Sequence, residues 1–234
     1  MALPKINTVT YELNLPSTDK PITYRPWIVK EQKALMIAQE SDDEKEIERA
    51  FANIVSECTF GKVDPYENPL FDVEYIFLQL RGKSVGEKIK LNLTCTDDGE
   101  TIVEKEIDLA DVKIQMDTKH SHIIKITEDI TMVMRYPKLS DMGGYTGTGQ
   151  IKQIFDMVKN CVEEIHDGET IHNRVDMGDK ELDEFIESMS QEHFTSVSNF
   201  FETMPKIIHE VTVTNPNTKK KNKIVIEGLQ SFFA

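Results

Sequence analysis

Alternating apolar residues near the start of the chain predict a β-hairpin. Every second residue is apolar from Val9 to Leu15, which is the pattern of a strand with one buried face. Residues 16–21 contain two prolines and turn the chain, and Ile22 and Tyr24 continue the alternation. We therefore expect two antiparallel strands here.

Helical spacing follows in the next two segments. Apolar residues recur at this spacing over about 29–40 and again up to Cys58. Ser41 and Glu44 match the capping-box pattern, in which a hydroxyl caps the helix and the acid three residues later binds back to the cap. The pattern predicts that the second helix begins after Ser41.

A third helix is predicted after the loop that contains Pro65. Asn68 offers a side-chain cap, and Pro69 suits the first position of a helix. Apolar residues then recur up to Leu80 at the spacing of a largely buried helix. Gly82 is the expected end of this helix.

Residues 88–136 show the period of β-strands. The segments 88–95 and 101–108 flank Asp97-Asp98-Gly99, which is a strong turn signal. Three further strand-like segments follow at short spacing, and we predict that they continue an antiparallel meander. They are residues 111–117, 122–127 and 130–136.

The glycine-rich segment 143–149 is the predicted domain boundary. We expect an N-terminal α+β domain over 1–142, a linker, and a C-terminal domain over 150–234. The fold class is α+β, with antiparallel strands and segregated helices, and no internal repeat is evident. The elements predicted for the C-terminal domain are helices over about 150–163, 179–189 and 191–203 and a hairpin over about 207–214 and 223–229.

Acidic charge limits the partners. The 234 residues include 27 Lys and Arg against 41 Asp and Glu, which gives a net charge of −14. Such a surface repels a phosphate backbone, so no nucleic-acid partner is expected. Lys219-Lys220-Lys221 with Lys223 lies between two predicted strands, where a solvated hairpin tip is expected. No stretch approaches the roughly 18 apolar residues of a membrane span, so no membrane partner is expected.

The three cysteines are predicted to be small buried residues. Cys58 and Cys161 each extend an apolar helical stripe, and Cys95 continues the alternation of a strand. An odd number without a C-x-x-C pair does not indicate a disulfide framework, so we expect a reducing cytoplasm.

The segment 143–149 also has part of the spacing of a phosphate-binding loop. Gly144 and Gly149 reproduce G-x-x-x-x-G, but Gln150 and Ile151 stand where a lysine and a hydroxyl residue would follow. Without them, the β- and γ-phosphates of a nucleotide lose their main counter-charge. A linker is favoured, and a nucleotide-binding enzyme that uses this loop is the remote alternative.

A second alternative is a zinc site between residues 161 and 176. Cys161, His166, His172 and Asp176 are close in sequence, but their spacing matches no closed site and Cys161 belongs to a buried stripe. Surface histidines in a hairpin are favoured. Because no nucleophile motif and no other metal motif occurs, the residues indicate a non-catalytic interaction protein without a cofactor.

Three longer segments resemble a known family. They are YELNLPSTDKPITYRPWIVKEQKALMIAQES (Tyr11 to Ser41), ECTFGKVDPYENPLFDVEYIFLQLRGKSVGE (Glu57 to Glu87) and NFFETMPKIIHEVTVTNPNTKKKNKIVIEGLQSFF (Asn199 to Phe233). Together they resemble the baseplate hub proteins of T-even-type contractile-tailed bacteriophages, a family that includes a hub subunit and a hub assembly factor. The resemblance covers nearly the whole chain and contains no catalytic pattern.

This resemblance implies a viral structural or assembly role. The expected partners are other baseplate hub and tail proteins, which the chain would meet in the host cytoplasm during assembly and, as a structural subunit, in the virion tail baseplate. The close alternative is an assembly factor that is absent from finished particles. The sequence does not separate the two roles, because both need the same contact surfaces.

Aromatic residues at expected exposed positions are the candidate contact anchors. Core packing is the favoured alternative for each of them. The strongest candidates lie at the C-terminus, because a chain end frays unless it is tied down. The candidates are Phe232, Phe233, Trp27, Tyr145 and Tyr66.

Overall fold

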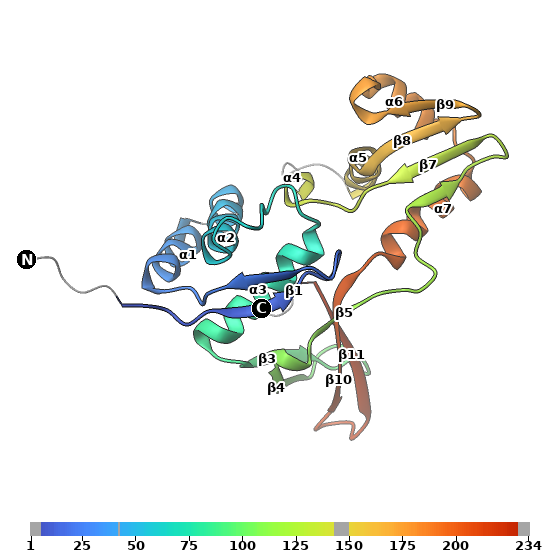
Figure 1. The fold of residues 1–234 in the computed structure, drawn as a ribbon. Helices are drawn as coiled ribbons and strands as arrows, with labels where there is room; N and C mark the ends of the chain where they lie inside the picture. Colours follow the sequence, from blue (N-terminus) through green and yellow to red (C-terminus); the bar gives the residue numbers. More distant parts are fainter. Residues whose placement is uncertain (1–5, 42, 143–149, 229–234) are drawn as a thin grey trace, which may run out of the picture. The chain divides into compact units, whose positions relative to one another are not determined.

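Figure 1 shows a computed structural model of the chain, which describes residues 6–41, 43–142 and 150–228. Contacts within the chain divide it into two compact units. Unit 1 comprises Met1–Gln115 and Lys206–Ala234, and unit 2 comprises Met116–Pro205. Unit 1 is therefore built from two separate stretches of sequence.

Over its described residues, unit 1 combines three α-helices with short antiparallel sheets. In its described residues β1 pairs with β2, β3 pairs with β4, and β5, β10 and β11 form a three-stranded sheet with β10 in the centre. The elements are β1 (Tyr11–Asn14), β2 (Pro21–Tyr24), α1 (Val29–Ser41), α2 (Glu44–Cys58), α3 (Leu70–Val85), β3 (Lys88–Thr94), β4 (Ile102–Asp108), a 3₁₀ turn (Leu109–Asp111), β5 (Lys113–Gln115), β10 (Lys206–Thr214) and β11 (Lys221–Glu227).

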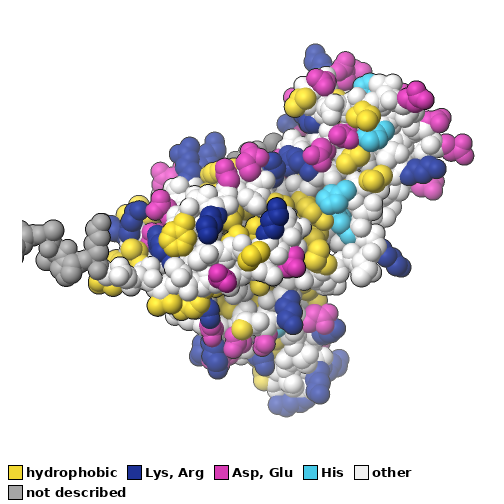
Figure 2. Space-filling view, in the orientation of Figure 1, with side chains coloured by type: hydrophobic (Ala, Val, Ile, Leu, Met, Phe, Trp, Pro, Cys, Tyr) yellow, Lys and Arg dark blue, Asp and Glu magenta, His cyan; other side chains and the backbone are white. Residues whose placement is uncertain are grey.

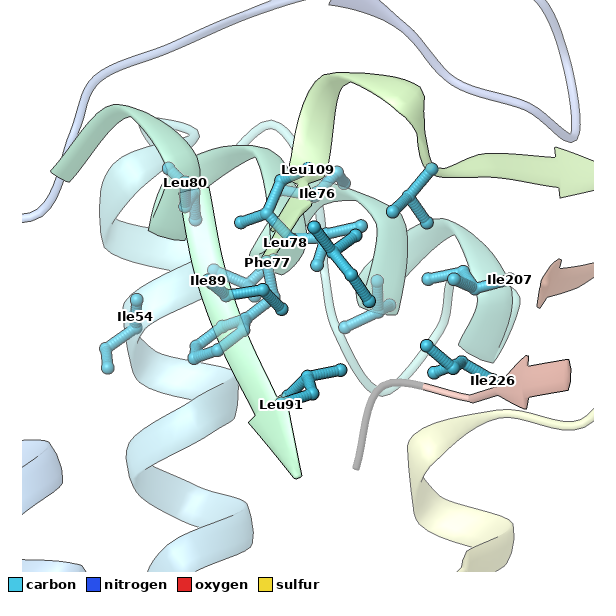
Figure 3. Close-up of a cluster of buried hydrophobic side chains, with 14 of the residues drawn as sticks. Ile54, Ile76, Phe77, Leu78, Leu80, Ile89, Leu91, Leu109, Ile207 and Ile226 are labelled. Atoms are coloured by element: carbon cyan, nitrogen blue, oxygen red, sulfur yellow. The ribbon is translucent and has the colours of Figure 1, made fainter. Parts of the chain in front are cut away.

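The core of unit 1 surrounds α3. Apolar side chains are buried on several sides of this helix, as expected for a helix that is apolar most of the way round. Figure 3 shows them beside side chains from α2, β3 and the two C-terminal strands. Labelled members of this core are Ile54, Ile76, Phe77, Leu78, Leu80, Ile89, Leu91, Leu109, Ile207 and Ile226.

The start of α2 differs from the prediction. Helix α1 continues through Ser41, whose hydroxyl donates back to the carbonyl of Ala38 at 2.7 Å. The N-cap of α2 is Asp43, and its carboxylate accepts a hydrogen bond from the backbone N–H of Lys45 at 2.9 Å. The predicted capping box at Ser41 is wrong because that residue belongs to the preceding helix.

Both ends of α3 also differ from the prediction. Pro69 is the cap residue, and the Asn68 side chain accepts from the backbone N–H of Asp64 instead of capping the helix. Gly82 is a buried interior residue, because the helix continues to Val85. The helix ends at Gly86, whose φ of +137° favours glycine.

Unit 2 places helices beside a four-stranded antiparallel sheet. The strand order is β6-β7-β8-β9. Its elements are β6 (Ile123–Lys125), β7 (Ile130–Met134), α4 (Leu139–Met142), α5 (Gln150–Cys161), β8 (Val162–Asp167), β9 (Thr170–Asn173), a 3₁₀ turn (Arg174–Asp176), α6 (Asp179–Glu187) and α7 (Gln191–Thr203). A core separate from that of unit 1 includes Met132, Met134, Val158, Leu182, Val197 and Phe200.

The strands after the β3–β4 hairpin do not form the predicted meander. The β5 strand pairs with β10, at Ile114 and Ile207, whereas β6 and β7 belong to the sheet of unit 2. The two units therefore divide the chain differently from the predicted domains 1–142 and 150–234, because the C-terminal hairpin returns to β5. The predicted linker 143–149 lies outside the described residues.

The predicted fold class is confirmed. Both units combine α-helices with small antiparallel sheets, as an α+β protein does. None of the described helices is long and apolar enough to cross a membrane.

Candidate interaction surfaces

An apolar stripe on the outer face of α1 is the candidate contact surface of unit 1. Val29, Met36 and Ile37 are each more than half exposed. Their spacing of i, i+7 and i+8 places them on one side of the helix. We call these three residues the α1 stripe. Figure 2 shows hydrophobic side chains over the part of unit 1 that carries β1 and α1.

The opposite side of α1 is held by a buried ion pair. Arg25 donates from Nη2 to Glu31 Oε1 at 3.0 Å and from Nη1 to the carbonyl of Pro26 at 3.1 Å. Glu31 Oε2 accepts the backbone N–H of Ile28 at 2.8 Å, and the backbone N–H of Arg25 donates to the carbonyl of Cys58 at 2.9 Å. This first arginine clamp joins β2, the start of α1 and the end of α2.

The charges of the first clamp are almost fully removed from solvent. The side chains of Arg25 and Glu31 are 14% and 4% exposed. Burial alone would raise the pKa of Glu31, but the hydrogen bonds from Arg25 and from the Ile28 N–H outweigh it and lower that pKa. The clamp therefore fixes the orientation of α1, and with it the direction in which the α1 stripe faces.

Unit 2 contains a second clamp with the same connections. Arg135 donates to both carboxylate oxygens of Asp141, at 2.7 and 2.9 Å, and to the carbonyl of Tyr136 at 3.0 Å. Asp141 accepts the backbone N–H of Lys138 at 2.7 Å, and the backbone N–H of Arg135 donates to the carbonyl of Cys161 at 2.8 Å. This second arginine clamp joins β7, α4 and the end of α5.

The candidate anchor Trp27 is buried. Its side chain is 8% exposed, and its ring lies 5.3 Å from that of Phe77. The indole N–H donates to the Gln32 side chain at 2.9 Å, so its polar atom is satisfied inside the protein. These contacts favour the alternative interpretation, in which Trp27 is a core residue. Of the other candidates, Tyr66 is partly exposed, and Phe232, Phe233 and Tyr145 lie outside the described residues.

Two hairpin turns that lie far apart in the sequence contact each other in unit 1. Asn215 is fully buried, and its amide donates to the carboxylates of Asp97 and Asp98 at 2.9 and 2.7 Å. Asn222 is also buried and accepts from the hydroxyl of Thr96 and the backbone N–H of Asp97. The C-terminal hairpin is thereby attached to the β3–β4 turn. Sequence spacing gives no signal for this contact, because the partners lie more than a hundred residues apart.

The cysteines are buried as predicted. Cys58, Cys95 and Cys161 have no exposed surface. Burial raises the pKa of the Cys58 thiol to about 11 and that of Cys161 to about 12. Both thiols are thus protonated at neutral pH, and a protonated thiol is a poor nucleophile.

The residues considered for a zinc site do not come together. The register of β8 and β9 places His172 opposite Ile165 and His166 opposite Ile171, so the two histidines lie on opposite faces of the sheet. His166 contacts the Glu164 carboxylate at 2.7 Å. In the described part of the chain, no three His, Cys, Asp or Glu residues are placed to hold a metal ion.

A histidine is enclosed by aromatic rings in unit 2. The Nδ1 atom of His120 lies 2.9 Å from the hydroxyl of Thr203, which itself donates to the carbonyl of Asn199. This direction assigns the proton to Nδ1 of His120, and its buried Nε2 has no hydrogen-bond partner in the described structure. Burial, followed by the proximity of His122, lowers the pKa of His120. Its ring stacks on that of Tyr136.

Comparison with known protein families identifies the family of this chain. A family model described as "T4 bacteriophage base plate protein" matches residues 8–234. The chain belongs to this family. Its resemblance to phage baseplate hub proteins is thereby confirmed.

One relative matches this chain over nearly its whole length. The "Baseplate hub assembly protein gp26" of Enterobacteria phage T4 is 25% identical over 226 residues, which cover 95% of this chain and 97% of the relative. No solved structure matches the chain.

Proposed function

We propose that this base plate protein acts in the structure or assembly of the phage baseplate hub, through contacts with other hub and tail proteins and without catalysis. The host cytoplasm is the place where these contacts would form. The α1 stripe is the observation that supports the proposal most directly. It exposes three large apolar side chains on a helix whose other face is fixed by a buried ion pair.

The chemistry of the stripe suits a protein partner. Burying an exposed aliphatic side chain yields about 1.5–3 kcal/mol, so three such residues on a rigid helix can provide a substantial share of a binding energy. Lys33 and Glu40 lie on the same side of α1 and are exposed, which gives the apolar stripe a charged rim.

The test is co-purification from infected cells. We would compare tagged wild-type protein with the double variant Val29→Asp, Met36→Asp and quantify the baseplate proteins that accompany each. The proposal predicts that the variant keeps its thermal unfolding profile and loses most of its partners. Val175→Asp is the matched control, because Val175 is 90% exposed in unit 2 and is expected to tolerate the same change. Undiminished co-purification by the folded double variant would contradict the contact role of the stripe.

A transient assembly role is the second form of the proposal. The name of the T4 relative, a hub assembly protein, favours this form. Mass spectrometry of purified particles and of infected-cell lysate separates the two forms. A fixed small copy number in particles identifies a structural subunit, whereas abundance in lysate and absence from particles identifies an assembly factor.

A further inference from the structure

A pocket in unit 2 is distinct from the α1 stripe. It has a volume of about 420 Å³ and lies between the β7–β8–β9 sheet and α6. Its apolar lining comes from Ile130 and Ile165 of the sheet, from Leu182 and Phe185 of the helix, and from Met177, which precedes the helix. A space of this size accommodates one large side chain of a partner, and it lies near the low end of the volumes of ligand pockets.

The strand register explains how the pocket acquires an acidic rim. Asp167 lies directly opposite Ile130, and Ile165 stands two residues before Asp167, so all three project from one face of the sheet. On α6, Glu181 and Phe185 are four residues apart and share one side of the helix. One carboxylate from the sheet and one from the helix therefore border the apolar lining.

The rim carboxylates are available for a partner. The side-chain carboxylate of Asp167 forms no hydrogen bond or ion pair with any described residue. Glu181 uses Oε2 to accept the backbone N–H of Gly178 at 3.0 Å, and no bond to its Oε1 is formed within the described structure. No lysine or arginine is among the described residues that line the pocket. Figure 2 shows acidic side chains over the part of unit 2 that carries α6, β8 and β9.

We propose that this pocket binds an aliphatic or aromatic side chain of a partner protein that carries lysine or arginine beside it. The apolar lining would supply affinity, and Asp167 and Glu181 would select the basic neighbour. A second copy of this chain fits poorly, because each copy has a net charge of −14. The inference goes beyond the proposed function, and it can fail while the α1 stripe still binds.

Three short peptides test the proposal against the full-length protein. The first has a phenylalanine flanked by lysines, the second has the same phenylalanine flanked by glutamates, and the third has an alanine flanked by lysines. Methyl-labelled NMR spectra would follow Ile130, Ile165 and Leu182 during titration. We expect the first peptide to shift these methyl signals with a Kd of about 1 mM, as befits a single side chain, and the other two to bind at least about tenfold more weakly.

Charge reversal at the rim provides the matched variants. Asp167→Lys is expected to lower the affinity for the first peptide by about tenfold or more. Glu187→Lys makes the same charge change on the opposite side of α6. The affinity of this variant for the first peptide should stay within about twofold of that of the wild type. Unchanged methyl signals far from the pocket would show that both variants are folded.

Several results would overturn the proposal. They are equal binding of the lysine- and glutamate-flanked peptides, equal loss of affinity in the two variants, or no shift at the pocket methyls up to about 10 mM peptide. Concentration-dependent association of the wild-type protein that Asp167→Lys abolishes would instead identify a second copy as the occupant, which also contradicts the proposal.

Discussion

The two arginine clamps repeat one arrangement in two units that are otherwise built differently. In each, the acid lies six residues after the arginine, is the third residue of a helix, and accepts the backbone N–H three residues before it. In each, the arginine N–H binds the carbonyl of a cysteine that ends another helix. An arginine clamp therefore orients the helix that follows a strand in both units.

The clamps differ in exposure and in geometry. The second pair is 28% and 8% exposed, and its arginine binds the carboxylate through two hydrogen bonds. The first pair is 14% and 4% exposed and has one such bond. A more deeply buried charge loses more when its partner is removed, because water cannot replace the partner. The comparison therefore predicts that unit 1 depends more strongly on its clamp than unit 2 does.

Removing the acid of the first clamp should have the largest effect. Glu31→Ala leaves Arg25 uncompensated and the Ile28 N–H without its acceptor, so we expect the free energy of unfolding of unit 1 to fall by about 3–5 kcal/mol. Trp27 is the only tryptophan and lies in unit 1, so its fluorescence during urea unfolding measures this change. Glu40→Ala on the exposed side of α1 is the control, and an equal loss in both variants would contradict the role of the clamp.

Removing the acid of the second clamp should lower stability by less. Asp141→Ala is expected to lower the stability of unit 2 by about 2–3 kcal/mol, because the more exposed Arg135 regains water. Hydrogen exchange of the Arg135 amide, which is bound to the Cys161 carbonyl, provides the measurement. A larger loss here than for Glu31→Ala would reverse the ranking of the two clamps.

The attachment of the C-terminal hairpin to the β3–β4 turn is a feature of unit 1, the unit that is built from two separate stretches of sequence. Asn215→Ala removes a buried amide from Asp97 and Asp98, and we expect a loss of about 1–2 kcal/mol in unit 1. Asn217→Ala is the matched control, because Asn217 is exposed and makes one side-chain bond, to Thr101. Hydrogen exchange in β11 should increase for Asn215→Ala only, and equal exchange in the two variants would argue against the attachment.

Lowering the pH should destabilise unit 2 before unit 1, because different groups titrate in the two units. We expect this change in stability to be the smallest of those predicted. The lowered pKa of His120 means that the unfolded chain takes up its proton first, so unit 2 loses stability as pH falls below 6.5 and through the lower folded pKa. Glu31, whose folded pKa is also lowered, contributes stability above pH 4.5 that is lost only as pH falls further, through its folded pKa. Amide protection factors, which correct for the intrinsic pH dependence of exchange, should therefore fall in unit 2 first between pH 7 and 5. His120→Phe should remove this step, and a step that persists would assign it to another group.

The sequence predicts most elements of this fold but not their assembly. Local periodicity and the Asp97-Asp98-Gly99 turn give the hairpin 88–108, because both depend on neighbouring residues. The pairing of β5 with β10 joins residues far apart in the chain, and periodicity carries no information about such partners. The end of α3 at Gly86 and not at Gly82 likewise depends on tertiary packing, since Gly82 is buried within the core.

The candidate surfaces could be predicted only in part. Trp27 was a candidate contact anchor with core packing as the favoured alternative, and its ring packs in the core beside Phe77. The α1 stripe has apolar residues on a helix that is also apolar on its inner side, so sequence alone does not show which side faces outward. The sequence also does not reveal that the two clamps share one arrangement, because the residues around the two arginines differ. Arg25 precedes a proline directly, whereas Arg135 is separated from one by Tyr136.

The measurement that tests the central claim most directly is baseplate assembly in cells infected with phage that lack this chain. The cells would supply in trans the wild-type protein, the Val29→Asp, Met36→Asp variant or the Val175→Asp control, and sedimentation would quantify complete baseplates. The account predicts complete baseplates with wild type and control and few with the folded stripe variant. Normal baseplate yield without any copy of the chain would contradict a role in the hub.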